Sequence, residues 1–550
     1  MTGDKFAIQG RIMDVVNRRD FTGTIHIENG HISELQEHPV ERGPLILPGL
    51  IDAHIHIESS MLVPSEFARL ASAHGTIATV SDPHEIANVL GMEGVQFMLD
   101  NAATTPFKFH FGAPSCVPAT PFETAGDNIT LKDIETLLQR EDIVSLSEMM
   151  NVPGVLNDDS EVLQKLEISR KYGKVVDGHA PGLMGEEISK YVGAGITTDH
   201  ESMTLEEARQ KLALGMQVQI REGSAARNLA DLFPLLHHDF ENCMLCSDDK
   251  HPDDLMEGHI DAMVRYAIQQ GVDPFNVLWS ACVTPVKTYG LKVGLLQEGD
   301  PADLILVDGL DSFKVLETYV QGQLVARDGV TLLKPTPVTP VNKFVARPLT
   351  SGDIEMQSDL ESVPVIRVVP GQLVTQREDV VPRRDPQGLI RSDPEADLLK
   401  LVVLNRYEQR PPGLGLIKGF GIGRAALASS VAHDSHNIVA VGGDDQSLLR
   451  AIALVIENKG GISAVSGHQE VVLPLPVAGL MSANDGNEVG QAYADLDALA
   501  RSMGSELDAP FMTLSFMALL VIPEIKLSDR GLFDGNSFQF IEAFQSQNDQ

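Results

Sequence analysis

The stretch LIDAHIHI (residues 50–57) opens the pattern that decides the fold. It is a short apolar run that ends in polar residues, and segments with helical spacing of apolar residues separate it from seven similar runs. The later runs are TIATVSD (76–82), FKFHFGAP (107–114), DIVSLSEM (142–149), GKVVDGHA (173–180), GITTDHES (195–202), MQVQIREG (216–223) and NCMLCSDD (242–249). Eight strand-like runs, each followed by a helix-like segment, predict a (β/α)8 barrel of the TIM type over residues 49–290.

The segments on both sides of this barrel have a different pattern. Residues 1–48 and 291–334 contain short alternating runs and turn signals such as Asn29-Gly30, so we expect them to build one small β domain together. Residues 335–348 are rich in proline and indicate an extended linker. Residues 349–550 mix apolar runs with helical segments, which predicts a separate C-terminal α+β domain.

Composition and charge narrow the class of protein. The 550 residues include 42 Lys and Arg against 77 Asp and Glu, a formal net charge of −35. Such a charge repels phosphate backbones and anionic lipid, so we expect no nucleic-acid partner and no membrane partner. Only four cysteines are present, and the amino-terminal residues lack the apolar core of a signal peptide. The sequence therefore favours a soluble, cytoplasmic protein, and we expect a homo-oligomer, with a dimer as the first hypothesis.

Residues with metal-binding chemistry stand at the ends of the strand-like runs, where a barrel of this kind keeps its active site. His54 and His56 lie two apart on the first run, so both side chains point the same way and can reach one metal together. The other candidate ligands, each at the end of a later run, are Glu148, His179, His200 and Asp248. Imidazole with carboxylate suits Zn, Mn or Fe, and these ligand types do not discriminate among the three metals.

Longer stretches resemble the adenine deaminases of the amidohydrolase superfamily. PGLIDAHIHIESS (48–60) is similar to the opening strand of that superfamily, whose pattern continues with Lys or Glu, two His and Asp on later strands. The stretches that resemble adenine deaminases are SDPHEIANVLG (81–91), PSCVPATPFETAG (114–126), SEMMNVPGV (147–155), DGHAPGL (177–183), IREGSAARNL (220–229), CSDDKHP (246–252), GLGLIKGFG (413–421), ALASSVAHDSHNIVAVG (426–442) and PFMTLSFMALLVIPEIKLSDRGL (510–532). The resemblance covers nearly the whole chain, including a C-terminal domain that most amidohydrolases lack.

The resemblance implies a binuclear centre of divalent metals, with manganese as the first expectation and iron or zinc as alternatives. One metal would lie on His54, His56 and Asp248, and the other on His179 and His200. A further carboxylate, Glu148, would bridge the two metals in the place where many relatives carry a carboxylated lysine.

The implied reaction is the hydrolytic deamination of adenine to hypoxanthine and ammonia, in purine salvage or catabolism. Metal ions lower the pKa of bound water to roughly 7, which supplies a nucleophile for the ring carbon that bears the amino group. We expect Asp248 to accept a proton and later to help deliver one to the leaving ammonia. Its neighbour Asp249 is expected on the opposite face of the strand.

A second acid must protonate the purine ring as charge builds there. Glu201 and Glu222 stand at strand ends and are the catalytic candidates, and the sequence does not rank them. The candidates for substrate contact are His84, Glu85 and Arg221. For all five residues, a role in orienting a ligand or in a salt bridge is equally compatible with the sequence.

The stretch HDSHN (433–437) lies outside the barrel and holds two histidines and an aspartate. It is compatible with an extra metal site, but a loop that closes over the barrel mouth is the favoured interpretation.

Two rival functions stay open. One is an amidohydrolase that acts on another purine or on a cyclic amide, and the other is a scaffold protein of the same fold without enzymatic activity, which would have broken ligands.

Overall fold

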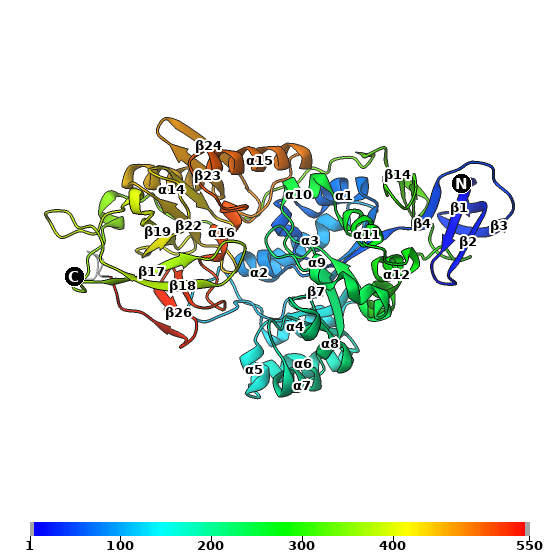
Figure 1. Cartoon of the computed structure of the whole chain (residues 1–550), viewed down its shortest axis with the longest axis horizontal. Helices are drawn as coiled ribbons and strands as arrows, with labels where there is room; N and C mark the ends of the chain where they lie inside the picture. Colours follow the sequence, from blue (N-terminus) through cyan, green and yellow to red (C-terminus); the bar gives the residue numbers. More distant parts are fainter. Residues whose placement is uncertain (1–4, 545–550) are drawn as a thin grey trace.

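A computed structural model describes residues 5–544, and Figure 1 shows its central part between the two ends of the molecule. This part holds eight parallel strands, in sheets of five and three that together form a ring. The strands are β5 (Leu50–Ile55), β6 (Thr76–Ser81), β7 (Lys108–Ala113), β8 (Ile143–Met149), β9 (Val175–Gly178), β10 (Thr198–Asp199), β11 (Gln217–Arg221) and β12 (Cys243–Cys246). Each of the eight predicted runs contains one of these strands, so the predicted TIM-type barrel is confirmed.

Backbone hydrogen bonds close the ring at two places between its regular ladders. The amide of Thr197 donates to the carbonyl of Val176 over 3.0 Å, which joins β9 to β10. The amide of Asp248 donates to the carbonyl of His54 over 2.9 Å, and the amide of His56 donates to the carbonyl of Asp248 over 3.2 Å. The first and last strands therefore meet at the point where three of the candidate ligands stand.

Helices alternate with the strands along the barrel. They are α1 (Pro64–Ala73), α2 (His84–Leu90), α3 (Met92–Ala102), α4 (Leu131–Leu138), α5 (Val152–Leu156), α6 (Ser160–Tyr172), α7 (Gly185–Gly193), α8 (Leu205–Ala213), α9 (Leu229–Leu232), α10 (Pro252–Glu257), α11 (Ile260–Gln269), α12 (Pro274–Leu278) and α13 (Thr284–Tyr289).

Local sequence sets the ends of these elements. All six residues of β5 are buried, as expected of a parallel strand that is covered on both faces. Helix α6 begins where the Asp159 carboxylate accepts hydrogen bonds from the amides of Glu161 and Val162. It ends at Gly173, whose φ of 64° is the left-handed conformation that terminates many helices.

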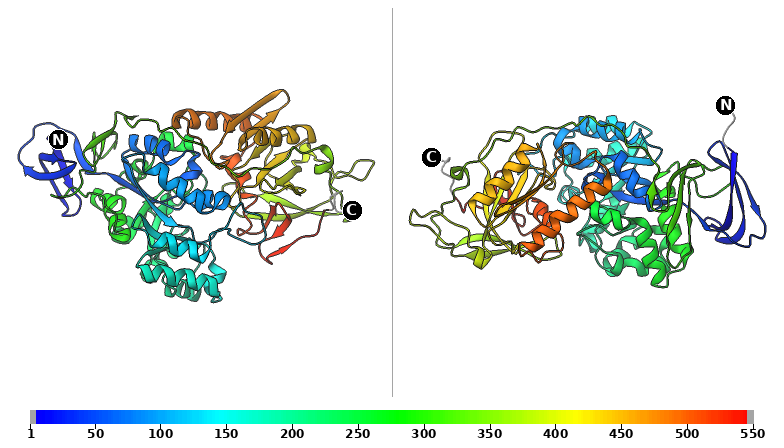
Figure 2. Two further views of the ribbon diagram at one scale, coloured as in Figure 1. Left: turned by 180° about the vertical axis from the view of Figure 1, so that it is seen from behind. Right: turned by 90° about the horizontal axis from the view of Figure 1, so that it is seen from above.

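Strands from both sides of the barrel share one eight-stranded sheet, in the order β16-β15-β14-β13-β4-β1-β2-β3. They are β1 (Lys5–Asp14), β2 (Arg19–Glu28), β3 (His31–Glu37), β4 (Leu45–Pro48), β13 (Leu304–Val307), β14 (Val315–Val320), β15 (Gln323–Arg327) and β16 (Val330–Thr331). Figure 2 shows this sheet at one end of an elongated molecule, with the barrel in the middle and the C-terminal region at the other end. The domain boundaries given above stay predictions.

The C-terminal region is built on a second eight-stranded sheet, in the order β18-β17-β20-β19-β22-β21-β23-β24. Its strands are β17 (Val363–Val368), β18 (Thr375–Val380), β19 (Leu399–Leu404), β20 (Gly413–Lys418), β21 (Ala426–Ser429), β22 (Ile438–Gly442), β23 (Gly461–Ser466) and β24 (Gln469–Pro474). The remaining elements are α14 (Asp445–Glu457), α15 (Gly486–Ser502), α16 (Pro510–Phe516) and a small sheet of β25 (Ile525–Ser528), β26 (Gly531–Asp534) and β27 (Gln539–Phe540).

The two faces of the C-terminal sheet pack against different parts of the protein. In β19, Val402 and Leu404 belong to the apolar core under α14. Leu401 and Val403 point to the other face, because side chains alternate along a strand, and they join the core that contains the barrel strands. A shared core fixes the C-terminal region against the barrel mouth. Among residues 5–544, no helix is long and apolar enough to cross a membrane.

Candidate active site

All six candidate metal ligands meet at the carboxyl ends of the barrel strands. His54 lies in β5 and Glu148 in β8, and His56, His179 and His200 come directly after their strands. The sixth ligand, Asp248, follows β12 by two residues. Five of these side chains are buried, and the His179 side chain is 18% exposed.

Glu148 lies at the centre of this cluster. Its Oε1 is 3.1 Å from Nε2 of His56, and its Oε2 is 3.0 Å from Nδ1 of His179 and 3.4 Å from Nε2 of His200. One carboxylate therefore contacts histidines from three different strands. Burial by itself raises the pKa of Glu148, but the hydrogen bonds from His179, His200 and His56 outweigh burial and hold the pKa well below its usual value.

Asp248 faces the other side of the cluster. Its Oδ1 is 3.4 Å from Nε2 of His54 and 3.2 Å from Nε2 of His56, and its Oδ2 accepts a hydrogen bond of 2.6 Å from Arg221. The backbone φ of Asp248 is 55°, in the left-handed region. Because β12 has already ended, strand alternation does not apply here. The expectation for Asp249 was therefore wrong: its side chain lines the same cavity as Asp248.

The free ring nitrogens of the histidines suit a cation. Nδ1 of His56 lies 3.1 Å from the carbonyl oxygen of Asp82, to which only an N–H can donate, so in the neutral ring Nε2 carries the lone pair that a metal would bind. Nε2 of His54 is buried and has no hydrogen-bond partner among the described residues. An unsatisfied buried polar atom is costly unless something binds it, and a divalent metal would satisfy this nitrogen in the neutral ring.

The donor atoms fall into overlapping groups whose members lie within 4.8 Å of one another. These groups are His54 with His56 and Asp248, His54 with Glu148 and His200, His179 with His200 and Glu201, and His56 with Asp82, His84 and Glu148. Imidazole and carboxylate donors at this density fit divalent metals. The sequence did not identify Asp82 as a donor, although it stands at the end of the second run.

The two catalytic candidates have different surroundings. Glu201 is buried, with its Oε1 3.4 Å from Nε2 of His200 and its carboxylate hydrogen-bonded to the Arg221 guanidinium. Glu222 is half-buried, lies 4.0 Å from Arg227, and is not among the described residues that line the cavity. The structure therefore brings Glu201 to the candidate metal ligands and leaves Glu222 outside the cavity.

The three candidates for substrate contact all line the cavity, but each has protein partners. Nδ1 of His84 is 3.0 Å from Asp82 and 3.4 Å from Glu148. Arg221 is held between Glu201 and Asp248. Both oxygens of Glu85, the third candidate, lie against histidines of the HDSHN stretch.

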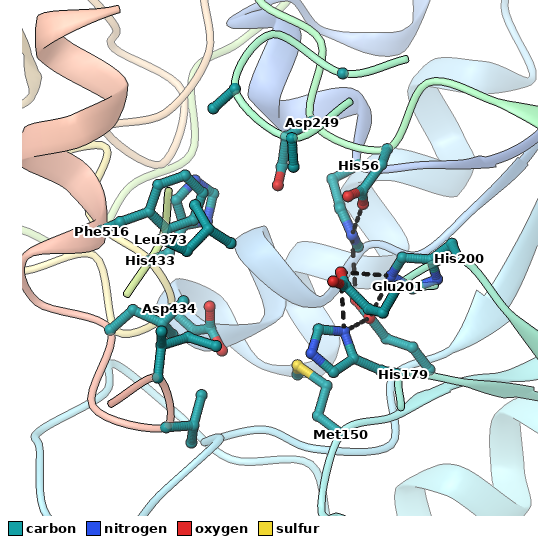
Figure 3. Close-up of a pocket in the computed structure, with 18 of the residues that line it drawn as sticks. His56, Met150, His179, His200, Glu201, Asp249, Leu373, His433, Asp434 and Phe516 are labelled. Atoms are coloured by element: carbon teal, nitrogen blue, oxygen red, sulfur yellow. Dashed lines mark hydrogen bonds and ion pairs between the residues drawn. The ribbon is translucent and has the colours of Figure 1, made fainter. Parts of the chain in front are cut away.

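The cavity itself lies between the candidate ligands of the barrel and the C-terminal region. Figure 3 shows His56, His179, His200 and Glu201 on one side, and Leu373, His433, Asp434 and Phe516 on the other. The C-terminal residues that line the cavity are Leu373, His433, Asp434, Met512, Phe516, Leu519, Val521 and Ile522. HDSHN was a signal for part of this wall, whereas the apolar residues carried no mark that distinguished them from ordinary core.

Comparison with known proteins agrees with this geometry. The amidohydrolase family model matches residues 45–325, and the model of the adenine deaminase C-terminal domain matches residues 372–539. The chain is 49% identical to an adenine deaminase of Methanosarcina mazei, over 98% of this chain and 99% of that protein. It is 51% identical to an adenine deaminase of Salinibacter ruber, over 98% of this chain and 99% of that protein. The chain therefore belongs to the adenine deaminase family, within the amidohydrolases.

Proposed function

We propose that the protein deaminates free adenine hydrolytically, consuming one water and releasing hypoxanthine and ammonia. The observation that carries this proposal is the cluster of four histidines with Glu148 and Asp248, which lines the cavity between the barrel and the C-terminal region. Near full-length identity of about 50% to curated adenine deaminases supports adenine as the substrate.

The donor set fits two divalent metals, and we propose manganese, with iron and zinc as alternatives. His54, His56 and Asp248 would hold one metal, and His179 and His200 the other. Their shared ligand would be Glu148, whose two oxygens face different histidines. When bound, such metals supply hydroxide at neutral pH.

The chain's own residues handle the protons. Asp248 is the proposed general base and acid, because its Oδ1 faces the ligand cluster while its Oδ2 is held by Arg221. The same guanidinium fixes Glu201 beside His200, so Arg221 orients two carboxylates toward the reacting centre. The cavity's apolar C-terminal side excludes water around the purine ring.

The remaining expectations also stay proposals. We propose a cytoplasmic location in purine salvage or catabolism, with no nucleic-acid or membrane partner, on the basis of the net charge of −35. The four cysteines are buried and unpaired, which agrees with a reducing compartment. A homodimer is the proposed assembly, and the molar mass measured by light scattering will test it.

A purine panel tests the function. Protein reconstituted with manganese, iron or zinc should release ammonia from adenine. Turnover of guanine or a cyclic amide in its place would select the rival amidohydrolase activity. A protein purified without chelator that holds no metal and acts on no member of the panel would support the scaffold hypothesis.

A further inference from the structure

The HDSHN stretch (433–437) is the part of the C-terminal region that enters the barrel mouth. It connects β21 to β22, and all five of its residues are buried. His433 stacks on Phe516 with ring centroids 4.9 Å apart, and Asn437 donates to the carbonyl of Thr124 over 2.9 Å. The stretch is therefore held from both sides, by its own domain and by the barrel.

Glu85 of the barrel binds this stretch through both carboxylate oxygens, one against Nδ1 of His433 and one against Nε2 of His436. These three residues also have donor atoms close enough for a metal. The protonation of His436 argues against a metal there. The amide of Ala432 donates to Nδ1 of His436 over 3.2 Å, so the ring proton sits on Nε2 and points at Glu85.

The electrostatics agree with a hydrogen-bonded clamp of Glu85, His433 and His436. Burial lowers the pKa of His436 to about 4, more than the charge of Glu85 raises it, so this ring is neutral. Burial also opposes the charge on His433, but the carboxylates of Glu85 and Asp249 outweigh burial and raise the pKa of His433 to about 9. A charged donor and a neutral donor thus share one carboxylate across the domain boundary.

The clamp places Asp434 in the cavity. Asp434 is 4% exposed, and its Oδ2 is buried without a hydrogen-bond partner among residues 5–544. In the described structure, no other acid that lines the cavity has such an oxygen. The other acids that line it are Glu85, Glu148, Glu201, Asp248 and Asp249.

We propose that Asp434 is a substrate-contacting residue that the C-terminal region contributes, and that it hydrogen-bonds a nitrogen of the purine. This inference rests on the proposed function, because the ligand it names is adenine. A buried oxygen without a partner is costly, and a hydrogen bond from the substrate would offset that cost. The wall beside Asp434 is apolar and includes Phe516, which suits a flat aromatic ring.

The environment of Asp434 allows it to accept or donate a hydrogen bond near neutral pH. Burial, reinforced by the charge of Glu85, raises the pKa of Asp434 to about 6. A carboxylate would accept from a purine N–H, and a carboxylic acid would donate to an unprotonated ring nitrogen. Asp434 can therefore pair with either kind of purine nitrogen.

The first test is the kinetics of Asp434→Ala and Asp434→Asn, with Asp508→Ala as the control. Asp508 is an exposed aspartate of the same C-terminal region. We expect Asp434→Ala to lower kcat/KM for adenine by about 10- to 100-fold, the range of one hydrogen bond to a charged group. Metal content should stay at the wild-type level, and Asp508→Ala should match wild type. Asp434→Asn, which is nearly isosteric, shows whether the loss arises from contact or from misfolding.

The second test identifies the contact itself. Inhibition constants of 1-, 3-, 7- and 9-deazaadenine and of unsubstituted purine are measured for wild type and for Asp434→Ala. Removing the nitrogen that Asp434 contacts should weaken inhibition of the wild type and leave inhibition of Asp434→Ala unchanged.

Two results would overturn the inference. One is a wild-type kcat/KM in Asp434→Ala. The other is that the inhibition constants of the analogues stand in the same ratios to one another in wild type and in Asp434→Ala. Failure of the proposed function is a separate result, because wild-type protein would then release no ammonia from adenine. A wild-type protein that deaminates adenine while Asp434→Ala is fully active refutes only the role of Asp434.

Discussion

Nδ1 of His433 donates to Oε1 of Glu85, joining two residues that are 348 positions apart in the chain. Glu85 stands in the first turn of α2, directly after the second barrel strand, and His433 belongs to the C-terminal region. The hydrogen bond holds the HDSHN stretch at the mouth of the barrel, beside the candidate metal ligands. The C-terminal region is therefore one wall of the candidate active site (Figure 3).

The clamp predicts the behaviour of Glu85→Gln. A neutral amide offers one acceptor oxygen, so His433 or His436 would lose its partner in a buried setting. Breaking one side of a buried charged pair costs about 3–5 kcal/mol. We expect a lower midpoint of thermal unfolding and a raised KM for adenine, with metal content close to wild type. Loss of both metals instead would show that Glu85 supports the ligands and not the C-terminal wall.

Glu148→Gln tests the proposed bridge. The amide cannot neutralise two cations, and it offers one acceptor oxygen where the carboxylate places one oxygen beside His56 and the other beside His179. We expect metal content to fall together with adenine turnover, as measured by elemental analysis and ammonia release. Two metals per chain at full occupancy in this variant would refute the bridging assignment.

Asp248→Asn separates catalysis from metal binding. The other proposed ligands remain, so the variant should keep much of its metal, while loss of acid–base assistance should cost about 10²–10⁴-fold in rate. Glu222→Gln is the matched control, because Glu222 also follows a barrel strand but lies outside the cavity. Its activity should equal that of wild type. An inactive Glu222→Gln with an active Asp248→Asn would reverse the proposed roles.

The interface between α10 and α15 predicts a pH dependence of stability. Burial, together with the charge of Asp253, raises the pKa of Asp497 in α15 to about 7. The unfolded chain binds this proton with a pKa of about 3.9, so the folded state favours the protonated acid. The stability that this group contributes is complete below about pH 4 and is lost as the pH rises through 7.

Asp497→Asn should therefore match wild type at pH 4 and be more stable at pH 8. The gain is at most a few kcal/mol, since each tenfold difference in proton affinity is worth about 1.4 kcal/mol. Urea unfolding at both pH values measures it. Asp495→Asn, an exposed position in the same helix, should show no such difference. An equal effect of Asp497→Asn at both pH values would show that burial does not displace the pKa of Asp497.

The barrel and the convergence of the six candidate ligands could be predicted because both depend on short-range patterns. Apolar runs mark the strands, and active-site residues of such barrels follow their carboxyl ends. The same pattern could not decide between Glu201 and Glu222 as the acid that protonates the purine ring. Arg221 points into the cavity at the end of β11, so its neighbour Glu222 points away by strand alternation, whereas β10 ends at Asp199, before Glu201.

The C-terminal wall could not be predicted in detail. Leu373, Phe516 and Ile522 have the apolar side chains of ordinary core residues, and only the shared core with the barrel brings them over the ligands. The HDSHN stretch indicated a site or a lid because it holds two histidines and an aspartate within five residues. The contact between this stretch and Glu85 depends on how the C-terminal region is placed against the barrel, and no local sequence pattern encodes that placement.

The most direct measurement of the central claim is a metal titration of the apoprotein with manganese, followed by ammonia release from adenine. We predict that activity rises with added metal and reaches its plateau at two manganese ions per chain, with hypoxanthine formed in equal amount to ammonia. A protein that binds two metals and leaves adenine unchanged, or one that deaminates adenine fully without metal, would contradict the account.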